Sequence, residues 1–501
     1  MTRGVTEHAR QAPQRPALIA PDAEGGAVIR TYGELDGRAR RLARVLRARG
    51  AGPDRPVAAV LRNGPEPFEV ATAAAMAGAA FLPLNWHLKE VELAYLLDDA
   101  RVGVVVGHQD LSAHLPPGGE RELVLLGAPK RSGRSYEHLV EAATADASLD
   151  SGAGPELIFY TSGTTAHPKG VVHAGLGDPA VRHLSMGGQV ALWGWSEDDV
   201  YVMSGPCYHA SHAGWGLTAL YAGATTVLPS RFDAEGFLRT VERYGGTRSF
   251  MVPAHFIRVL QLPEPTRTAI DARSLKLVVH GGAPCPLSVK RRMMAAFPGT
   301  EFHELYGASE GGATRISPQE WLEHPGSVGR PWPGVEILIR GEDGSAMVAG
   351  EDGIIFIRPA SSSRFTYRND PDATAHAWLG DAFTVGDIGH LSADGYLTIT
   401  DRVSDMVLWG GVNIAPREIE EVLYEHPDVV DCAVFGVPDA RDGEHLKALV
   451  ELRAPVSWEA LAAHVRERLA DYKVPREWEE VGELPRDPNG KVLKRLLRGS
   501  G

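Results

Sequence analysis

Over its first 330 residues the chain alternates between short apolar runs and amphipathic stretches. Thr31-Tyr-Gly-Glu-Leu opens an amphipathic stretch that Gly50 ends. Its apolar residues fall on one helical face: Leu35, Ala39, Leu42 and Leu46. We therefore predict a helix there, followed by a strand at 57–61, a helix at 67–78 and a strand at 102–106. Strands that alternate with helices indicate a mainly parallel sheet covered on both faces.

The alternation resumes after residue 190. Short apolar runs predict strands near 200–203, 225–228, 249–253 and 275–280, and a helix is predicted at 233–244. Ligands of such sheets bind in the loops beyond the carboxyl ends of the strands. The intervening segment 109–155 is richer in glycine, proline and charge, so we interpret it as surface connections.

The pattern changes near Val335. Alternating runs at 336–340 and 354–358, separated by glycine-rich turns, predict antiparallel hairpins in a small β-rich subdomain at 335–400. From Arg402 onward the pattern predicts a compact unit: helix 416–424, strand 430–437, and helix 458–469 with Ser457 as N-cap. The fold expected is therefore α/β, with an N-terminal domain at 1–401 and a small α+β C-terminal domain at 402–501.

Composition narrows the class of protein. The 501 residues include 64 acidic and 51 basic side chains, and the net charge of −13 argues against a general nucleic-acid or anionic-membrane binder. Cys207, Cys285 and Cys432 are widely spaced and odd in number, which favours neither disulfides nor a zinc cluster and suits the reducing cytoplasm. Residues 1–10 lack the apolar core of a signal peptide, and the apolar stretch 71–84 is too short to span a membrane.

The stretch most informative about chemistry follows the apolar residues 157–159, which we interpret as a short buried strand. Gly163 lets the backbone direct its N–H groups toward one point, and Lys169 adds a compact positive charge. The loop's hydroxyl donors are Thr161, Ser162, Thr164 and Thr165. Such a loop suits a polyphosphate, although Pro168 occupies the position where the Walker pattern requires glycine. A solvated Ser/Thr turn is the alternative.

The run from Tyr160 to Gly170 resembles the phosphate-binding loop of the AMP-forming adenylate enzymes, which include acyl-CoA synthetases, luciferases and peptide-synthetase adenylation domains. Ala166 departs from the glycine usual in that family. Further motifs match in the same order, so the resemblance covers essentially the full chain. It implies ATP, Mg²⁺ and coenzyme A as ligands, and a C-terminal domain that swings between two poses.

Two further segments match the family on its adenine side. The first is the turn after the predicted strand at 275–280, whose candidate residues are Gly281, Gly282 and Ala283. The second is Leu305-Tyr-Gly-Ala-Ser-Glu310, where Tyr306 offers a face for adenine, Ser309 a hydroxyl for the α-phosphate and Glu310 an oxygen ligand for Mg²⁺. Ser309 replaces the usual threonine but keeps the donor. Tight turns are the alternative for both segments.

Asp387 and Arg402 match the ribose side of the family's site. The resemblance implies that Asp387 accepts hydrogen bonds from both ribose hydroxyls and that Arg402 bridges ribose and phosphate. Without the resemblance, a solvated turn is the preferred explanation of Asp387, and an ion pair with a neighbouring acid is the alternative for Arg402.

The acid pocket is expected around Pro206-Cys-Tyr-His209. The resemblance implies that His209 gates the carboxylate, with Tyr208 and Trp215 as pocket walls and Gly307 and Gly312 among the lining residues. A lone histidine after a strand is otherwise more often a packing or turn residue. Trp193, Trp195 and Trp215 either shorten the pocket or belong to the core.

The remaining matches lie in the C-terminal domain. Ser404 occupies the hinge position, where aspartate or lysine is usual, and Gly410 and Gly411 match the loop that approaches the thiol in the second pose. Lys491 matches the mobile lysine that bridges the acid's carboxylate and the α-phosphate as charge develops.

The function implied is an ATP-dependent acid–thiol ligase. It adenylates a carboxylic acid with release of pyrophosphate, then transfers the acyl group to coenzyme A. Alternatives are a ligase that uses an amine or a carrier protein as acceptor, an enzyme that adenylates nitrite to diazotise an aryl amine, and a non-catalytic nucleotide sensor. The identity of the acid and the oligomeric state stay open, and a homodimer is compatible with the sequence.

Overall fold

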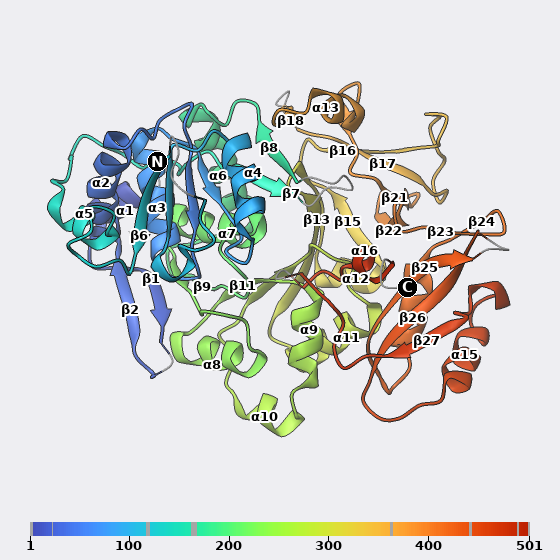
Figure 1. Cartoon of the computed structure of the whole chain (residues 1–501). Coiled ribbons are helices and arrows are strands. Elements are labelled where there is room, and N and C mark those ends of the chain that lie inside the picture. The colour runs from blue at the N-terminus through green and yellow to red at the C-terminus, as the bar shows by residue number, and fades with distance from the viewer. Residues whose placement is uncertain are drawn as a thin grey trace. The chain divides into compact units, whose positions relative to one another are not determined.

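The computed structural model describes residues 4–22, 24–116, 121–161, 168–360, 364–439, 443–487 and 490–498 (Figure 1). The chain divides into two compact units. Unit 1 contains Met1–Phe250 and Ser363–Thr374, and unit 2 contains Met251–Ser362 and Ala375–Gly501. A short segment from late in the sequence therefore belongs to the N-terminal unit. The predicted division at Arg402 into a fixed and a mobile domain stays a prediction.

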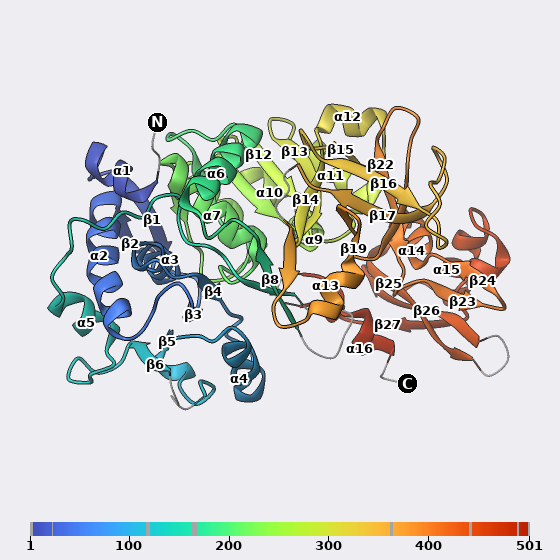
Figure 2. The same ribbon diagram turned by 90° about the horizontal axis from the view of Figure 1, so that it is seen from above.

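One sheet of unit 1 is entirely parallel, with the strand order β4-β3-β5-β6. Its strands are β3 (Val57–Val60), β4 (Phe81–Pro83), β5 (Val104–His108) and β6 (Glu122–Leu126). The helices of this region are α2 (Tyr32–Ala48), α3 (Glu66–Ala77), α4 (Glu90–Asp99) and α5 (Tyr136–Ala142), and α2 packs beside α3 (Figure 2). The predicted alternation of strands and helices is confirmed. The interpretation of 109–155 as surface connections is wrong in part, because β6 and α5 lie inside it.

The predicted helix at 31–50 is confirmed, with its N-terminus fixed by a capping box. Thr31 Oγ1 accepts a hydrogen bond from the Glu34 N–H at 3.2 Å, and Glu34 Oε2 accepts one from the Thr31 N–H at 2.9 Å. The four apolar residues that predicted the helix are all buried. Local sequence and tertiary packing therefore favour the same helix.

A second sheet of unit 1 is formed by β9 (Val200–Val202), β10 (Thr225–Val227), β1 (Pro16–Pro21) and β2 (Ala27–Thr31), and Arg248 of β11 (Arg248–Met251) pairs with Tyr201 of β9. The helices are α1 (Val5–Gln11), α6 (Pro179–Trp193), α7 (Ala210–Ala222) and α8 (Ala234–Tyr244). A third, three-stranded sheet joins β7 (Phe159–Thr161), β8 (Lys169–His173) and β18 (Phe365–Tyr367) in antiparallel pairs. The predicted helix at 233–244 and the strands near 200, 225 and 249 are confirmed.

In unit 2, β12 (Leu277–His280) pairs in parallel with β13 (Glu301–Ala308), and antiparallel pairs then join β13, β14 (Gly311–Ile316), β15 (Ser327–Pro331), β22 (Leu397–Arg402), β21 (Asp387–Leu391) and β17 (Gly353–Arg358). β16 (Glu336–Arg340) and β17 form the predicted hairpin, which is confirmed. The other elements of unit 2 are β19 (Trp378–Leu379), β20 (Ala382–Phe383), α9 (Pro253–Gln261), α10 (Glu264–Ala269), α11 (Leu287–Ala296) and α12 (Pro318–Glu323). Helix α13 (Pro371–Ala377) begins in the part of the chain assigned to unit 1 and ends in the part assigned to unit 2.

The C-terminal part of unit 2 surrounds a core of its own. Its sheet contains β23 (Val407–Trp409), β24 (Val412–Ile414), β25 (Val429–Asp439), β26 (Gly443–Leu452) and β27 (Glu477–Glu480). Its helices are α14 (Pro416–Tyr424), α15 (Trp458–Arg466) and the short α16 (Lys494–Arg498), and Ser457 caps α15 as predicted. The predicted α/β class with a small α+β C-terminal part is confirmed. Within the described ranges, no helix combines the length and apolarity needed to cross a membrane.

Candidate functional site

The predicted phosphate loop connects two antiparallel strands. Thr161 at the end of β7 pairs with Lys169 at the start of β8. Ser162, Gly163, Thr164, Thr165 and Ala166 lie outside the described residues. The strand before the loop differs from the prediction: it begins at Phe159 and is half-buried, whereas Leu157 forms a separate bridge with Phe81.

The segment after β18 packs beside this hairpin. The Arg368 N–H donates to the Gly170 carbonyl at 2.7 Å. Lys169 Nζ lies 3.6 Å from Asp370 Oδ2 and 5.1 Å from the centre of the Tyr367 ring. Both neighbours of Lys169 therefore come from a segment about 200 residues away, and local motifs gave no sign of them.

The adenine-side turn follows β12 directly. Gly282 has a φ of +80°, a left-handed conformation that favours glycine. A Cβ on Gly281 would lie 2.5 Å from the Leu305 carbonyl oxygen of β13, so only glycine fits this close approach. The two glycines are thus required by the backbone around the end of β12, whichever ligand binds there.

Tyr306, Asp387 and Arg402 form one hydrogen-bonded cluster in unit 2. The Tyr306 hydroxyl donates to Asp387 Oδ2 at 2.8 Å, and Arg402 Nε donates to Asp387 Oδ1 at 2.8 Å. Asp387 and Arg402 are opposite each other in the register of β21 and β22. Burial, together with the Asp387 charge, raises the pKa of Tyr306 well above its ordinary value, so this hydroxyl stays a donor.

Asp387 is 4% exposed, and each of its oxygens accepts one of these bonds. An ionised carboxylate has roughly four acceptor positions, so capacity remains for a pair of ribose hydroxyls. Tyr306 is also buried, at the end of β13. The cluster therefore brings together three residues that the sequence assigned to the nucleoside.

Ser309 and Glu310 form the turn between β13 and β14. Glu310 is buried and Ser309 half-buried. A single carboxylate suits Mg²⁺ in a nucleotide site, since this ion takes one or two protein carboxylates and completes its shell with phosphate oxygens and water. The donor chemistry at Glu310 thus fits the expected magnesium.

A buried ion pair between α11 and β13 in unit 2 was not predicted from the sequence. Lys290 Nζ of α11 lies 2.7 Å from Glu304 Oε2 of β13, and 4.7 Å from the centre of the Trp321 ring. Lys290 is 0% exposed, and His280 Nε2 lies 3.7 Å from the same Glu304 oxygen. Burial and the Lys290 charge lower the pKa of His280 well below its ordinary value, so His280 is neutral.

The predicted acid-pocket residues of unit 1 lie at the start of α7. His209 is the N-cap residue, and its Nδ1 lies 2.7 Å from Ser211 Oγ. Trp215 contacts an aromatic cluster, with ring centroids 5.5 Å from Trp193 and 5.4 Å from Trp195. All three indoles are buried. Their mutual packing explains why these tryptophans are inside, and it agrees with the core interpretation left open above.

Gly307 and Gly312 face each other across β13 and β14 in unit 2. A Cβ on Gly312 would lie 2.1 Å from the Trp332 ring, which therefore occupies the space beside this glycine. Sequence reasoning assigned the glycine to the pocket but did not identify Trp332.

In the C-terminal part, Gly410 and Gly411 form the two-residue turn between β23 and β24. Their φ values are +55° and +86°, as expected for a tight hairpin turn of the primed type. Ser404 lies in the turn before β23, and its carbonyl accepts a hydrogen bond from Arg498 Nη1 at 2.7 Å. The predicted hinge position is thus hydrogen-bonded to Arg498 of α16.

Lys491 lies in the loop before α16. Its N–H donates to Asp487 Oδ1 at 3.0 Å. Burial lowers the pKa of its ammonium group, and the Arg402 guanidinium lowers it further, although part of the residue's surface stays exposed. The predicted lysine and the predicted ribose-side arginine therefore lie within electrostatic range of each other.

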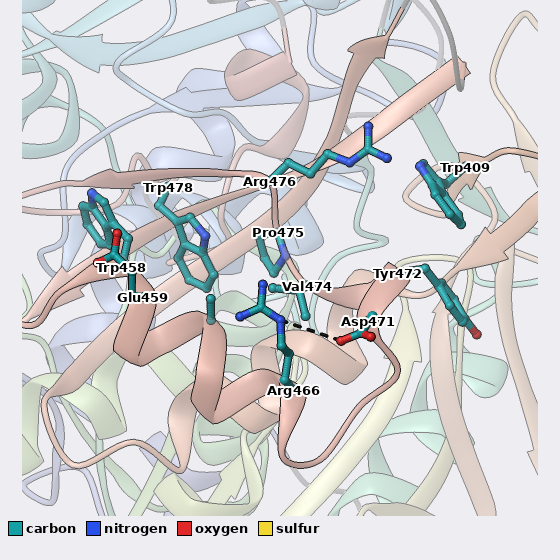
Figure 3. A pocket seen from close by; sticks show the side chains of 11 residues that line it. Trp409, Trp458, Glu459, Arg466, Asp471, Tyr472, Val474, Pro475, Arg476 and Trp478 are labelled. Atoms are coloured by element: carbon teal, nitrogen blue, oxygen red, sulfur yellow. Dashed lines mark ion pairs between the residues drawn. The ribbon is translucent and has the colours of Figure 1, made fainter.

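A cavity of about 900 Å³ is lined by Trp409, the residue that precedes the Gly410–Gly411 turn (Figure 3). The Trp409 and Tyr472 rings are stacked, 5.8 Å apart and 4° from parallel, and the Arg476 guanidinium lies 5.6 Å from the Trp409 ring centre. Two arginines and two acidic side chains line the cavity together with three tryptophans, so its charges nearly balance. The lining residues are Trp409, Trp458, Glu459, Ala462, Arg466, Asp471, Tyr472, Val474, Pro475, Arg476 and Trp478. Sequence reasoning did not find this cavity.

Comparisons with known proteins identify the family of the chain. Residues 5–364 match the AMP-binding enzyme family, and residues 418–491 match the AMP-binding enzyme C-terminal domain. The chain therefore belongs to the AMP-binding enzyme family.

Several proteins of known activity resemble the chain over nearly its whole length. A feruloyl-CoA synthase of an Amycolatopsis species is 34% identical over 97% of both chains. An indoleacetate–CoA ligase of Aromatoleum aromaticum is 32% identical over 99% of this chain and 97% of its own. The solved structure of o-succinylbenzoate CoA synthetase from Bacillus subtilis, with its acyl-adenylate intermediate, has a TM-score of 0.82 and 26% identity, and the match covers 99% of this chain and 98% of that one.

These findings confirm the predicted activity: the chain is an ATP-dependent, AMP-forming acid–CoA ligase. ATP and coenzyme A are its substrates, and Mg²⁺ is typical of the family. The amine, carrier-protein and nitrite alternatives are not favoured by these relatives.

Proposed function

We propose that some of the residues predicted from the sequence act in adenylation and others act in thioester formation. We also propose that the Tyr306–Asp387–Arg402 cluster binds the nucleoside of ATP. The observation that supports this proposal is the hydrogen bonding of Asp387 by both of its partners at 2.8 Å. The two bonds hold the carboxylate in one orientation, so its remaining lone pairs are positioned for the vicinal hydroxyls of a ribose.

In the first half-reaction, an oxygen of the substrate carboxylate attacks the α-phosphorus, and the bond from that phosphorus to pyrophosphate breaks. An ionised acid needs no general base, so the protein's contribution is positioning and charge stabilisation. Lys169 neutralises charge on the departing phosphates, Ser309 donates to the α-phosphate, and Lys491 bridges the carboxylate and the α-phosphate. Glu310 would hold Mg²⁺, which screens the phosphate charges when bound.

In the second half-reaction, the thiol sulfur of coenzyme A attacks the acyl carbon, and the carbon–oxygen bond to AMP breaks. The C-terminal domain at 402–501 turns about Ser404 and brings Gly410 and Gly411 to the thiol side. Glycines at both turn positions permit close approach of a narrow pantetheine chain. His209 gates the carboxylate before this step.

The proposed acid has an apolar, preferably aromatic, body. The feruloyl-CoA synthase and the indoleacetate–CoA ligase described above act, by their names, on acids that carry an aromatic ring. The test is mass spectrometry of products from MgATP and a panel of aryl, fatty and short branched acids, with coenzyme A, nitrite or aryl amines as separate arms. Formation of an aryl-CoA together with AMP supports the proposal. Formation of AMP without any thioester would contradict the assignment of coenzyme A as the acceptor.

The pH dependence of adenylation tests the role of Lys491. Its ammonium form bridges the two anions and is lost as pH rises through its pKa, which lies below the ordinary lysine value of about 10.4. We expect kcat/KM for MgATP to fall on the alkaline side at a pH below that value. In Lys491→Arg, whose guanidinium stays charged, this alkaline decline should disappear while the overall rate is lower. If the alkaline decline of kcat/KM is unchanged in Lys491→Arg, the titrating group is not Lys491.

The cellular setting and the assembly are also proposed. All three cysteines are buried and reduced, which supports a cytoplasmic location. The homodimer compatible with the sequence stays a prediction, and light scattering of the purified chain measures it.

A further inference from the structure

Among the residues that the structure describes, two side chains of the segment 364–374 lie close to Lys169. Its Nζ lies 3.6 Å from Asp370 Oδ2 and 5.1 Å from the centre of the Tyr367 ring. The Lys169 side chain is 18% exposed and that of Asp370 is 39% exposed. The ammonium is thus held between a carboxylate and an aromatic face, next to the loop predicted to bind phosphate.

The two carboxylate oxygens of Asp370 make different contacts. Oδ1 accepts a hydrogen bond from the Ala373 N–H at 2.9 Å in the first turn of α13, whereas Oδ2 faces Lys169. The first contact fixes the carboxylate on the backbone, so its second oxygen keeps a defined position. The fold therefore fixes the carboxylate of this pair, and the Lys169 side chain extends to meet it.

The residue before Asp370 anchors the same segment to α4. Asn369 has a φ of +54°, which asparagine tolerates better than most residues. Its Nδ2 donates to Asp99 Oδ1 at 2.8 Å, and the Tyr160 hydroxyl donates to Asp99 Oδ2 at 2.5 Å. One aspartate at the end of α4 thereby ties the strand before the phosphate loop to the segment that carries Asp370.

We propose that Asp370 is an internal counter-ion of Lys169: its carboxylate pairs with the ammonium beside the predicted phosphate loop and is displaced from it by the triphosphate. This inference rests on the proposed role of Lys169. Before ATP binds, the Asp370 carboxylate is paired with the Lys169 ammonium. The incoming phosphates therefore compete with this carboxylate for the ammonium. The departing pyrophosphate meets the same competition, so Asp370 also favours its release.

The test is Asp370→Asn, which keeps an oxygen for the Ala373 N–H and removes the charge facing Lys169. An exposed ion pair of this kind is worth little, so we expect the KM for MgATP and the inhibition constant of pyrophosphate to fall together by about two- to fivefold. The KM of the acid should not change. Asp178→Asn is the matched control, because Asp178 Oδ1 accepts from the Ala180 N–H at the start of α6 in the same way.

Lys169→Met separates the two ways in which the proposal can fail. If Lys169→Met leaves the KM for MgATP unchanged, Lys169 does not bind phosphate and the proposed function of this loop is wrong. If Lys169→Met raises that KM while Asp370→Asn leaves it unchanged or raises it, only the counter-ion role is overturned. In the double variant the effect of Asp370→Asn should vanish, because its target is gone.

Discussion

Replacement of Lys491 by alanine is expected to lower the rate of adenylate formation by about 10²- to 10³-fold, the usual loss when one preorganised donor to a developing charge is removed. Thioester formation from supplied acyl-adenylate should stay close to the wild-type rate, since the proposed bridge between carboxylate and α-phosphate is no longer needed. Pyrophosphate exchange into ATP measures the first step, and a single turnover of synthetic acyl-adenylate with coenzyme A measures the second.

A lysine of the same domain provides the control for this experiment. Lys447 on β26 lies 2.8 Å from Glu479 at the surface, and Lys447→Ala should leave both half-reactions unchanged. Equal losses of both half-reactions in Lys491→Ala would contradict the assignment, because they would indicate damage to the C-terminal domain as a whole.

Replacement of Lys290 by methionine should destabilise unit 2 by about 3–5 kcal/mol, because it leaves the Glu304 carboxylate buried without its partner. The pair is separated by 2.7 Å, and the Lys290 side chain is fully buried. Denaturant unfolding followed by tryptophan fluorescence measures the change, since Trp321 lies against Lys290. We expect the denaturant concentration at the midpoint of the fluorescence transition of unit 2 to decrease.

Two further variants test the cause of that loss. Lys290→Met combined with Glu304→Leu should recover most of the stability, because an apolar pair of similar volume needs no counter-ion. Lys276→Met changes an exposed lysine near the start of β12 and should alter stability by less than about 0.5 kcal/mol. A Lys290→Met protein as stable as the wild type would mean that Glu304 finds another proton or partner at no cost.

The fold was predictable wherever local patterns and packing agree. The helix at 32–48 has both an apolar face and a capping box, and the hairpin of β16 and β17 consists of two apolar runs with a glycine-containing turn segment between them. The segment 109–155 was interpreted wrongly in part, because its glycine, proline and charge outweigh the short apolar run of β6. That strand is held by its parallel pairing with β5, which is a tertiary interaction that one sequence does not display.

The site was predictable residue by residue but not as an arrangement. Asp387 and Arg402 were each assigned to the ribose from motifs, while their direct pairing across β21 and β22 follows from strand register. The Lys290–Glu304 pair and the Lys169–Asp370 pair were missed. In the first case the only sequence signal was a lysine between the apolar Val289 and Met293 of α11, and in the second the partners are about 200 residues apart.

The pairing of β18 with β8 affects how the N-terminal unit folds during synthesis. Tyr367 pairs with Val171, so the strand that follows the phosphate loop lacks its outer neighbour until synthesis has passed residue 367. A nascent chain of 250 residues contains most of unit 1 but leaves this edge of β8 open, and open strand edges attract other chains. Completion of the N-terminal unit on the ribosome thus waits for the emergence of a segment encoded in the last third of the gene.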